Sequence, residues 1–440
     1  MKRAARRALL VLLLAAAAGA GWFGLLPELT LPSGPIAVAA PSPAISPTAS
    51  ASIVPSPPAR GPSSSPAANT PAPTPLPTNI DARRATLSAA LDRLRATYGI
   101  PGISAAMTFA DGSTWVGTTG LAVVASHRPV TTRTAFAAGS ISKTFTAALV
   151  MALVEDGRLA LDSPVKTYLP RLVINRAITV RELLDHTSGL NDFFSHPAID
   201  KALLAHRARV WTAADSLRYV GKPYFKPGTG WHYSNTNYLV LGMLAEAVGG
   251  SPLAGQLRQR FFDPLGLDHT FYQAGEDPRG PLAHGYRFSG PGPKLNGIDV
   301  SDGTAVVPFT SVVTAAGGAG SIATTARDLV TWARALYGGG VLLPATVATI
   351  VDDAAVTTAL KSSVPYGLGV QVVTIDGRPT LGHSGRLLGF RAVMRWLPDQ
   401  GIAVAVLTNQ SRTDPNLLIR DLLRTVLGVP PLCAGCPQRP

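Results

Sequence analysis

The stretch AAGSISKTFTAALVMALVEDG, residues 137–157, places a serine three positions before a lysine at the start of a long apolar run. Residues three apart lie above one another on a helix face, with Cβ atoms about 5–6 Å apart, so Lys143 can reach the Ser140 hydroxyl. A serine becomes a strong nucleophile when a base takes its proton, and lysine is such a base only when neutral. Apolar surroundings favour the neutral amine. The stretch therefore predicts a helix that carries a nucleophile and its base.

The spacing alone leaves another interpretation open, in which Ser140 caps the helix and Lys143 extends to solvent. Ser163 and Lys166 have the same spacing in a polar segment that predicts a turn. The Ser-x-x-Lys pattern therefore needs further residues before it indicates chemistry.

Two later motifs supply such residues. Tyr233-Ser234-Asn235 sets a phenol and an amide two positions apart, so both can face one cleft. Tyr233 can pass a proton to a leaving group and Asn235 can hold a substrate carbonyl or Lys143, although a buried turn would also explain this motif. His383-Ser384-Gly385 falls on a predicted strand, where an edge can pair with a bound peptide and glycine permits close approach.

The hydrophobic pattern predicts an α+β fold. A helix over 81–99 precedes two strands around the Asp111-Gly112 turn, and two more strands flank residues 398–401 before a helix over 414–427. The two ends of the folded part are therefore expected to share one antiparallel sheet flanked by helices. The segments between them predict a mainly helical insertion, with helices over 140–156, 178–186, 201–220, 235–248 and 325–337.

The order Ser-x-x-Lys, Tyr-x-Asn, His-x-Gly is far more specific than any one motif. With these residues the chain resembles the superfamily of serine β-lactamases and penicillin-binding D-alanyl-D-alanine carboxypeptidases. The resemblance runs from about residue 82 to 427 and includes the segments TAFAAGSISKTFTAAL, EDGRLALDSPVKTYLP, ITVRELLDHTSGL, FKPGTGWHYSNTNYLVLG, GGAGSIATTARDL and GHSGRLLGF. It implies the β-lactamase/transpeptidase-like fold.

The resemblance also implies an acyl-enzyme mechanism without cofactor or metal. Ser140 would be the nucleophile, Lys143 its base and Tyr233 the proton carrier to the leaving nitrogen. Asn235 would orient the substrate, His383, Ser384 and Gly385 would form the strand beside it, and the backbone N–H groups of Ser140 and Arg386 would hold the oxyanion.

Two departures narrow the expected activity. Many members carry lysine at the third motif, whereas the histidine of this chain resembles the carboxypeptidase and esterase-like branches. Arg386 replaces a small or hydroxylated residue, and its guanidinium could bind a substrate carboxylate or point to solvent. A D-alanyl-D-alanine carboxypeptidase-like or β-lactamase-related hydrolase is expected, with a stem peptide, β-lactam or ester as substrate.

Three other function classes compete. The stretch Gly382-His-Ser-Gly-Arg386 nearly matches the nucleophile elbow of α/β-hydrolases, which would make Ser384 the nucleophile, but its fifth residue is arginine. The eight histidines are dispersed, without the spacing of a hydrolytic metal site. His186 is expected to be a structural turn residue. A non-catalytic wall-binding or β-lactam-sensing domain is the third alternative.

The N-terminal segments predict export. Residues 1–26 combine four positive charges with an uncharged apolar stretch, which suits a signal peptide or a membrane anchor. Residues 27–78 hold 15 of the 38 prolines and predict a disordered linker. The catalytic domain is then expected over 79–432, outside the cytoplasm, either membrane-anchored through residues 8–26 or secreted.

Charge and cysteine content limit the partners. Removing the first seven residues and the linker from the net charge of +13 leaves +9 on residues 79–440, which favours anionic surroundings such as cell-wall peptidoglycan. Nucleic acid is not expected for an exported chain. Cys433 and Cys436 lie in the 433–440 tail, where a local disulfide is the default outside the cytoplasm.

Overall fold

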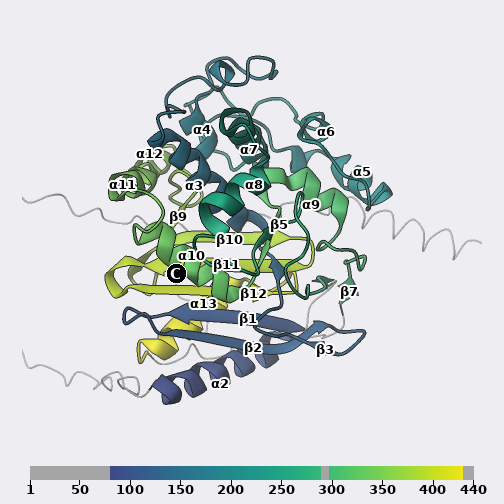
Figure 1. The fold of residues 1–440 in the computed structure, drawn as a ribbon, viewed down its shortest axis with the longest axis vertical. Helices are drawn as coiled ribbons and strands as arrows, with labels where there is room; N and C mark the ends of the chain where they lie inside the picture. Colours follow the sequence, from purple (N-terminus) through teal and green to yellow (C-terminus); the bar gives the residue numbers. More distant parts are fainter. Residues whose placement is uncertain (1–79, 289–296, 430–440) are drawn as a thin grey trace, which may run out of the picture.

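A computed structural model describes residues 80–288 and 297–429. The predictions for residues 1–26, 27–78 and 433–440 lie outside the described residues. Within them the α+β prediction is confirmed by a seven-stranded antiparallel sheet in the order β3-β2-β1-β12-β11-β10-β9 (Figure 1). Its strands are β1 (Gly102–Thr108), β2 (Thr114–Val123), β3 (Arg128–Pro129), β9 (Gln371–Ile375), β10 (Arg378–Leu387), β11 (Phe390–Leu397) and β12 (Ile402–Thr408).

The two ends of the folded chain meet at the centre of this sheet, as the sequence predicted. Strand β1 pairs with β12 in a register that sets Ile103 opposite Thr408. Both strands are buried along their whole length, because helices cover both faces of the sheet and leave neither side of a central strand exposed. An antiparallel sheet of this kind excludes the parallel α/β-hydrolase fold.

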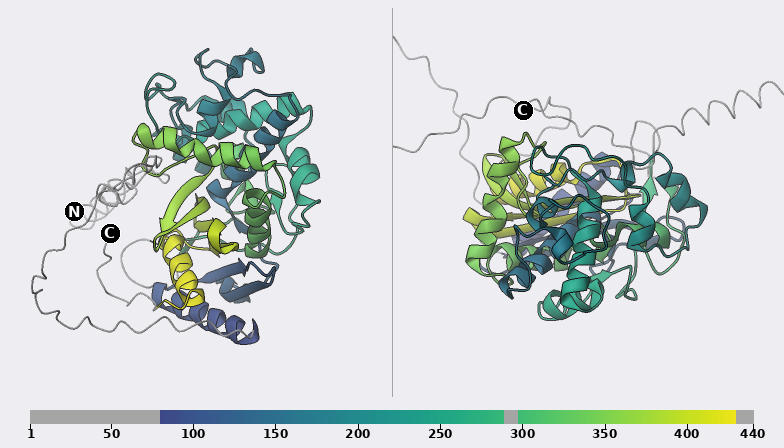
Figure 2. Two further views of the ribbon diagram at one scale, coloured as in Figure 1. Left: turned by 90° about the vertical axis from the view of Figure 1, so that its left-hand side faces the viewer. Right: turned by 90° about the horizontal axis from the view of Figure 1, so that it is seen from above.

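Two layers of helices enclose the sheet. Helices α2 (Ile80–Tyr98) and α13 (Pro415–Val426) pack together on one face through leucine-rich stripes (Figure 2). Helices α3 (Ser142–Glu155) and α10 (Ala326–Tyr337) belong to the main core on the other face, where Phe145 stacks on Trp332 with ring centroids 4.0 Å apart.

The helical insertion gathers at one end of the molecule, beyond α3 (Figure 1). Its helices are α4 (Val180–Leu184), α5 (Ile199–Ala205), α6 (Ala213–Leu217), α7 (Asn235–Gly249), α8 (Leu253–Leu257) and α9 (Thr310–Ala316), with α11 (Pro344–Asp352) and α12 (Ala354–Ala359) following α10. The single helix expected over 201–220 is wrong. It is two helices, because Thr212 and Asp215 form a capping box that begins α6.

Two small sheets were not predicted. Strands β4 (Phe136–Ala137), β8 (Ile322–Thr324) and β5 (Phe271–Tyr272) form one, and β6 (Tyr286–Arg287) and β7 (Ile298–Asp299) form the other. Strands of two or three residues give too little periodicity to be recognised in a sequence. In the part of the chain that the structure describes, no single helix has the length and apolar character needed to cross a membrane.

Helix α3 begins differently from the prediction. A 3-10 turn, η2 (Gly139–Ile141), carries Ser140 and leads directly into α3. Strand β10 also differs, because it is not the edge of the sheet along its whole length. Strand β9 pairs with residues 378–382 of β10, whereas residues 383–387 continue beyond that pairing and lie against η2.

Two glycines allow this close contact between β10 and η2. A Cβ atom on Gly385 would lie 1.9 Å from the carbonyl oxygen of Ala138, and one on Gly139 would lie 2.7 Å from the backbone nitrogen of Arg386. Gly139 also has φ +52°, which side chains rarely adopt. The serine motif and the third motif are therefore held together by backbone contact.

We predict that Gly385→Ala lowers the free energy of unfolding by about 1–3 kcal/mol, because the new methyl group must push the two backbones apart. Thermal or denaturant unfolding measures this change. Gly255→Ala is the control, since a Cβ at that exposed helical position meets nothing within 4 Å. Equal stabilities for Gly385→Ala and the wild type would show that the backbones do not touch as described.

Candidate active site

The Ser140 and Lys143 side chains meet as the helical spacing predicted. The Lys143 Nζ atom lies 3.1 Å from Ser140 Oγ, 2.7 Å from Asn235 Oδ1 and 2.9 Å from the carbonyl oxygen of Ala319. Lys143 has no exposed surface, so the alternative in which it extends to solvent is wrong. The cap positions of η2 and α3 make no side-chain hydrogen bonds, so Ser140 is not a helix cap either.

The surroundings of Lys143 match the hydrogen-bonding capacity of a neutral amine. A neutral amine has two N–H groups and one lone pair. Two of the three neighbours are carbonyl oxygens, which only accept, and the third is the Ser140 hydroxyl. With both N–H groups on Asn235 and Ala319, the lone pair faces Ser140 and can accept its proton.

Burial supplies the neutral form. Desolvation lowers the pKa of Lys143 to about 7, and the negative charge of Asp192 acts in the opposite direction. Near neutral pH a substantial fraction of Lys143 is therefore unprotonated, as a general base requires. The sequence predicted the direction of this change, because the run around Lys143 is apolar.

The Tyr-x-Asn motif joins the same cluster. Asn235 is the first residue of α7 and contacts Lys143 directly, while the Tyr233 ring centroid lies 4.9 Å from Lys143 Nζ. The His186 ring packs against the Tyr233 ring, with the two centroids 4.3 Å apart. The Nδ1 atom of His186 accepts the N–H of Ser234 at 3.2 Å, so this histidine supports the turn that presents Tyr233.

His383 of the third motif is buried and neutral. Its Nδ1 atom donates to the Ser384 carbonyl oxygen at 2.6 Å, since a carbonyl can only accept, and its Nε2 atom accepts from the Tyr366 hydroxyl at 2.9 Å. Burial lowers the pKa of His383 to about 3, helped by the nearby Lys143 charge. The Tyr233 and His383 ring centroids lie 6.3 Å apart.

The Ser384 hydroxyl is hydrogen-bonded to Gln371. The N–H and the hydroxyl of Ser384 both donate to Gln371 Oε1, at 3.0 and 3.3 Å. An amide oxygen is too weak a base to activate a serine, so the structure gives Ser384 no support as a nucleophile. Its neighbour Gly385 is the residue that lets β10 approach η2.

Arg386 contributes both backbone and side chain at the end of β10. Its backbone nitrogen borders Gly139, immediately before Ser140. Its side chain stands directly opposite Arg391 on β11, and like charges in that position repel. Burial and Arg287 lower the pKa of Arg386, and burial and Arg386 lower that of Arg391. The side chains of Arg386, Arg391 and Arg287 therefore form a positively charged group at this end of β10.

The sequence prediction missed Asp192 and Tyr366 and expected His186 to be a structural turn residue. His186 is a turn residue, with φ +70°, but it is also buried against Tyr233. All three are polar residues in largely buried segments, and that is the only signal they give. Their contacts with the site residues Asn235, His383 and Ser234 span at least 17 residues of sequence, so no local spacing reveals them.

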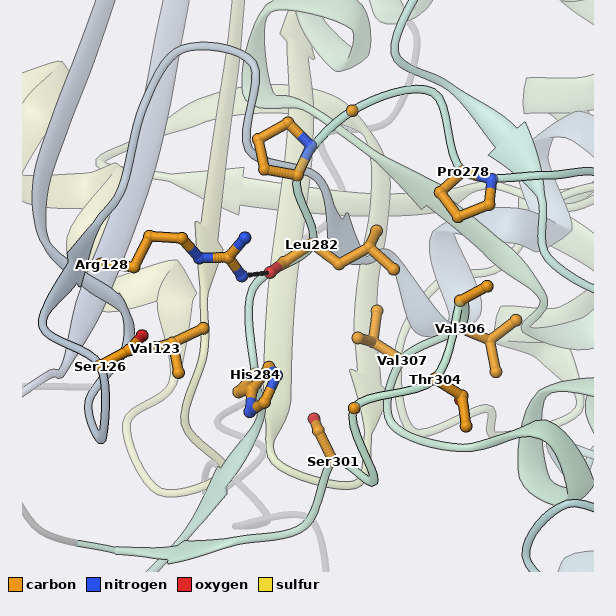
Figure 3. Close-up of a pocket in the computed structure, with 14 residues that line it drawn as sticks. Val123, Ser126, Arg128, Pro278, Leu282, His284, Ser301, Thr304, Val306 and Val307 are labelled. Carbon is orange, nitrogen blue, oxygen red and sulfur yellow. Dashed lines mark hydrogen bonds between the residues drawn. The ribbon is translucent and has the colours of Figure 1, made fainter.

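A separate cavity of about 590 Å³ contains none of the predicted site residues. It lies between the β2–β3 end of the sheet and the loops near residues 278–284 and 301–307 (Figure 3). The Arg128 guanidinium in its wall donates to the Leu282 carbonyl oxygen. Within the described ranges, no three His, Cys, Asp or Glu side chains are grouped to hold a metal ion.

The chain is similar to known proteins over most of its length. The family model described as Beta-lactamase matches residues 87–427. Penicillin-binding protein 4 of Amycolatopsis lactamdurans is 30% identical over 77% of this chain and 87% of its own length. A D-aminopeptidase of Cereibacter sphaeroides is 26% identical over 80% of this chain, which spans 64% of that relative.

The solved structures extend the likeness to three dimensions. The D-amino acid amidase of Ochrobactrum anthropi SV3, complexed with L-phenylalanine amide, has a TM-score of 0.67 and 26% identity, over 78% of this chain and 98% of its own. The D-stereospecific amidohydrolase of a Streptomyces species gives 0.60 and 28%, over 75% and 94%. The chain belongs to the beta-lactamase family and is a serine hydrolase of that fold.

Proposed function

We propose that this chain hydrolyses an amide bond through an acyl-enzyme on Ser140, with Lys143 as the base. The observation that carries the proposal is the buried Lys143 amine, whose two carbonyl contacts leave its lone pair for the Ser140 hydroxyl. As Ser140 Oγ attacks the substrate carbonyl carbon, its proton moves to Lys143. The proton then passes through Tyr233 to the leaving nitrogen, and water releases the acyl group.

The oxyanion in this proposal lies between the backbone N–H groups of Ser140 and Arg386. The contact of Gly139 with the Arg386 backbone nitrogen supports it, because the two amides belong to segments in direct contact. Donors fixed in this way stabilise developing charge without reorganising. Asn235 and the His383–Gly385 strand would orient the substrate. His383 would line the substrate site as an uncharged side chain.

The preferred substrate is a peptide that ends in a D-amino acid with a free carboxylate. Relatives are named as penicillin-binding proteins, D-aminopeptidases and D-amino acid amidases, which supports a D-amino acid beside the reacting bond. The accumulation of Arg386, Arg391 and Arg287 favours an anionic terminus over a free amine. A D-alanyl-D-alanine carboxypeptidase-like activity therefore fits this chain better than an aminopeptidase activity.

Export is part of the same proposal. The charged and apolar N-terminal segment and the proline-rich linker would hold the domain outside the cytoplasm, membrane-anchored or secreted, where wall peptides with D-amino acids occur. The site would also acylate with β-lactams. An esterase of the same fold and a domain without turnover are the outcomes that the following tests distinguish.

We predict that a penicillin forms a covalent adduct on the wild type and none on Ser140→Ala, as measured by intact mass over time. Ser384→Ala is the matched control and should keep the adduct, because its hydroxyl contacts Gln371. Slow loss of the adduct would indicate a penicillin-binding peptidase, and rapid drug loss a β-lactamase. Absence of both adduct and turnover on peptide and ester substrates would contradict the proposed mechanism.

We predict that Arg386→Ala lowers kcat/KM about 10- to 100-fold for an acetylated peptide ending in D-alanyl-D-alanine, the value of a charge-assisted hydrogen bond of about 1.5–3 kcal/mol. For the same peptide with a C-terminal carboxamide, Arg386→Ala should change kcat/KM little. Arg327→Ala, at an exposed position on α10, is the control. An unchanged preference for the carboxylate in Arg386→Ala would remove Arg386 from substrate recognition.

A further inference from the structure

Asp192 carries a carboxylate that the proposed mechanism does not use and that contacts the Asn235 amide. The Asn235 Nδ2 atom donates to Asp192 Oδ2 at 2.8 Å, while Asn235 Oδ1 accepts from Lys143 at 2.7 Å. The contacts form one continuous chain from Asp192 through Asn235 and Lys143 to Ser140 Oγ. Of the four side chains in this series of contacts, Asp192 is nearly fully buried and Lys143 is fully buried.

We propose that Asp192 is a positioning residue, which orients the Asn235 amide and governs through its charge the pH at which Lys143 can act. The inference rests on the proposed role of Lys143 as the base for Ser140. It assigns a function to a residue outside the three motifs.

The two ends of the Asn235 amide differ, because the oxygen accepts hydrogen bonds and the NH₂ group donates them. A carboxylate only accepts hydrogen bonds, so Asp192 takes the Nδ2 hydrogens and leaves Oδ1 of Asn235 for Lys143. In the opposite orientation the Asn235 NH₂ group would face Lys143 and donate to its lone pair. That lone pair is the one that must accept the Ser140 proton. Asp192 therefore keeps the base available as well as in place.

Asp192 is itself held firmly. Its Oδ1 atom accepts the N–H of Phe194 at 3.1 Å and caps the 3-10 turn η4 (Phe193–Ser195). The backbone N–H of Phe193, the residue after Asp192, donates to Thr236 Oγ1 at 3.0 Å. The Thr236 hydroxyl donates to the Asn191 carbonyl oxygen at 2.6 Å. The loop that carries Asp192 is thereby joined to the first turn of α7, which carries Asn235.

The pKa of Lys143 also depends on which of its neighbours carry charge. The ionisable side chains around it are Asp192, His186, His383, Tyr233 and Tyr238. Burial lowers the pKa of both histidines and raises that of Tyr238, which keeps these groups neutral near pH 7. Asp192 is the carboxylate among these side chains. Burial raises its own pKa, and the N–H groups of Phe194 and Asn235 and the charge of Lys143 oppose that effect. The negative charge of Asp192 in turn opposes the effect of burial on the pKa of Lys143.

Removing the negative charge of Asp192 lowers the pKa of Lys143 further, so the neutral base exists at lower pH. The acid limb of the acylation rate must then move to lower pH. A residue with a purely structural role would change the size of the rate and leave the position of this limb unchanged.

The test measures the second-order rate of acylation of the full chain by a fluorescent penicillin between pH 5 and 9. Asp192→Asn keeps an oxygen for the Asn235 NH₂ group and loses the charge, so its acid limb should move down by about one pH unit or more. Asp192→Ala loses both effects and should also acylate about tenfold more slowly at its best pH. Asp192→Glu keeps the charge, and its limb should stay at the wild-type position.

Asp328→Asn provides a matched control. Asp328 is also buried and accepts from the His269 N–H at 3.0 Å and the Thr270 hydroxyl at 2.8 Å, but it does not contact Lys143. Its limb should coincide with that of the wild type, and unfolding temperatures report the structural cost of every variant.

The outcomes separate the two proposals. A wild type without Ser140-dependent acylation overturns the proposed function and this inference with it. If the wild type acylates and the acid limbs of Asp192→Asn and Asp192→Glu are both unmoved, the inference alone is overturned. The same holds if both acid limbs are displaced by the same amount. Displacement in Asp192→Asn with the Asp192→Glu and Asp328→Asn limbs unmoved supports it.

Discussion

The structure depends above all on the burial of one lysine amine among three oxygen atoms. Lys143 contacts Ser140 on its own turn, Asn235 at the start of α7 and Ala319 in the turn before β8. These groups come from segments separated by up to 176 residues. An amine without exposed surface requires its partners, so its hydrogen bonds draw the sheet side and the helical insertion together at one point.

The same burial gives the amine its chemistry. A lysine in water would be protonated near neutral pH, whereas desolvation brings the pKa of Lys143 to about 7. The acceptors around it satisfy the neutral form, and the glycines of η2 and β10 bring two backbone amides close to the hydroxyl. The geometry of the site and the protonation state of Lys143 therefore have one physical cause, the exclusion of water from the contact between Lys143 and Ser140.

The sequence predicted the parts of this arrangement that depend on local pattern. Helical spacing placed Lys143 beside Ser140, alternation and turn residues gave the central strands, and the α+β class followed from helices and strands at both ends of the chain. The order of three motifs gave the family. The contact of Asn235 with Lys143 was one of two possibilities that the Tyr-x-Asn motif left open.

The remaining features depend on tertiary contacts that no local pattern encodes. Asp192 reaches Asn235 across 43 residues, and the Arg386–Arg391 pair exists only through the register of β10 and β11. The single helix over 201–220 failed because an unnoticed capping box begins a new helix. Predicting β10 as an edge strand omitted β9, whose five residues are mostly half-exposed and therefore resemble a loop.

A titration of Lys143 itself, by NMR of the wild type with ¹³C at the lysine Cε atoms, tests directly whether this amine is neutral near pH 7. The Lys143→Met variant identifies the signal, because the other lysines remain in the spectrum. We expect a midpoint near pH 7 for Lys143. A midpoint near that of an ordinary lysine, about 10.4, would mean that the amine is charged at neutral pH and cannot be the base for Ser140.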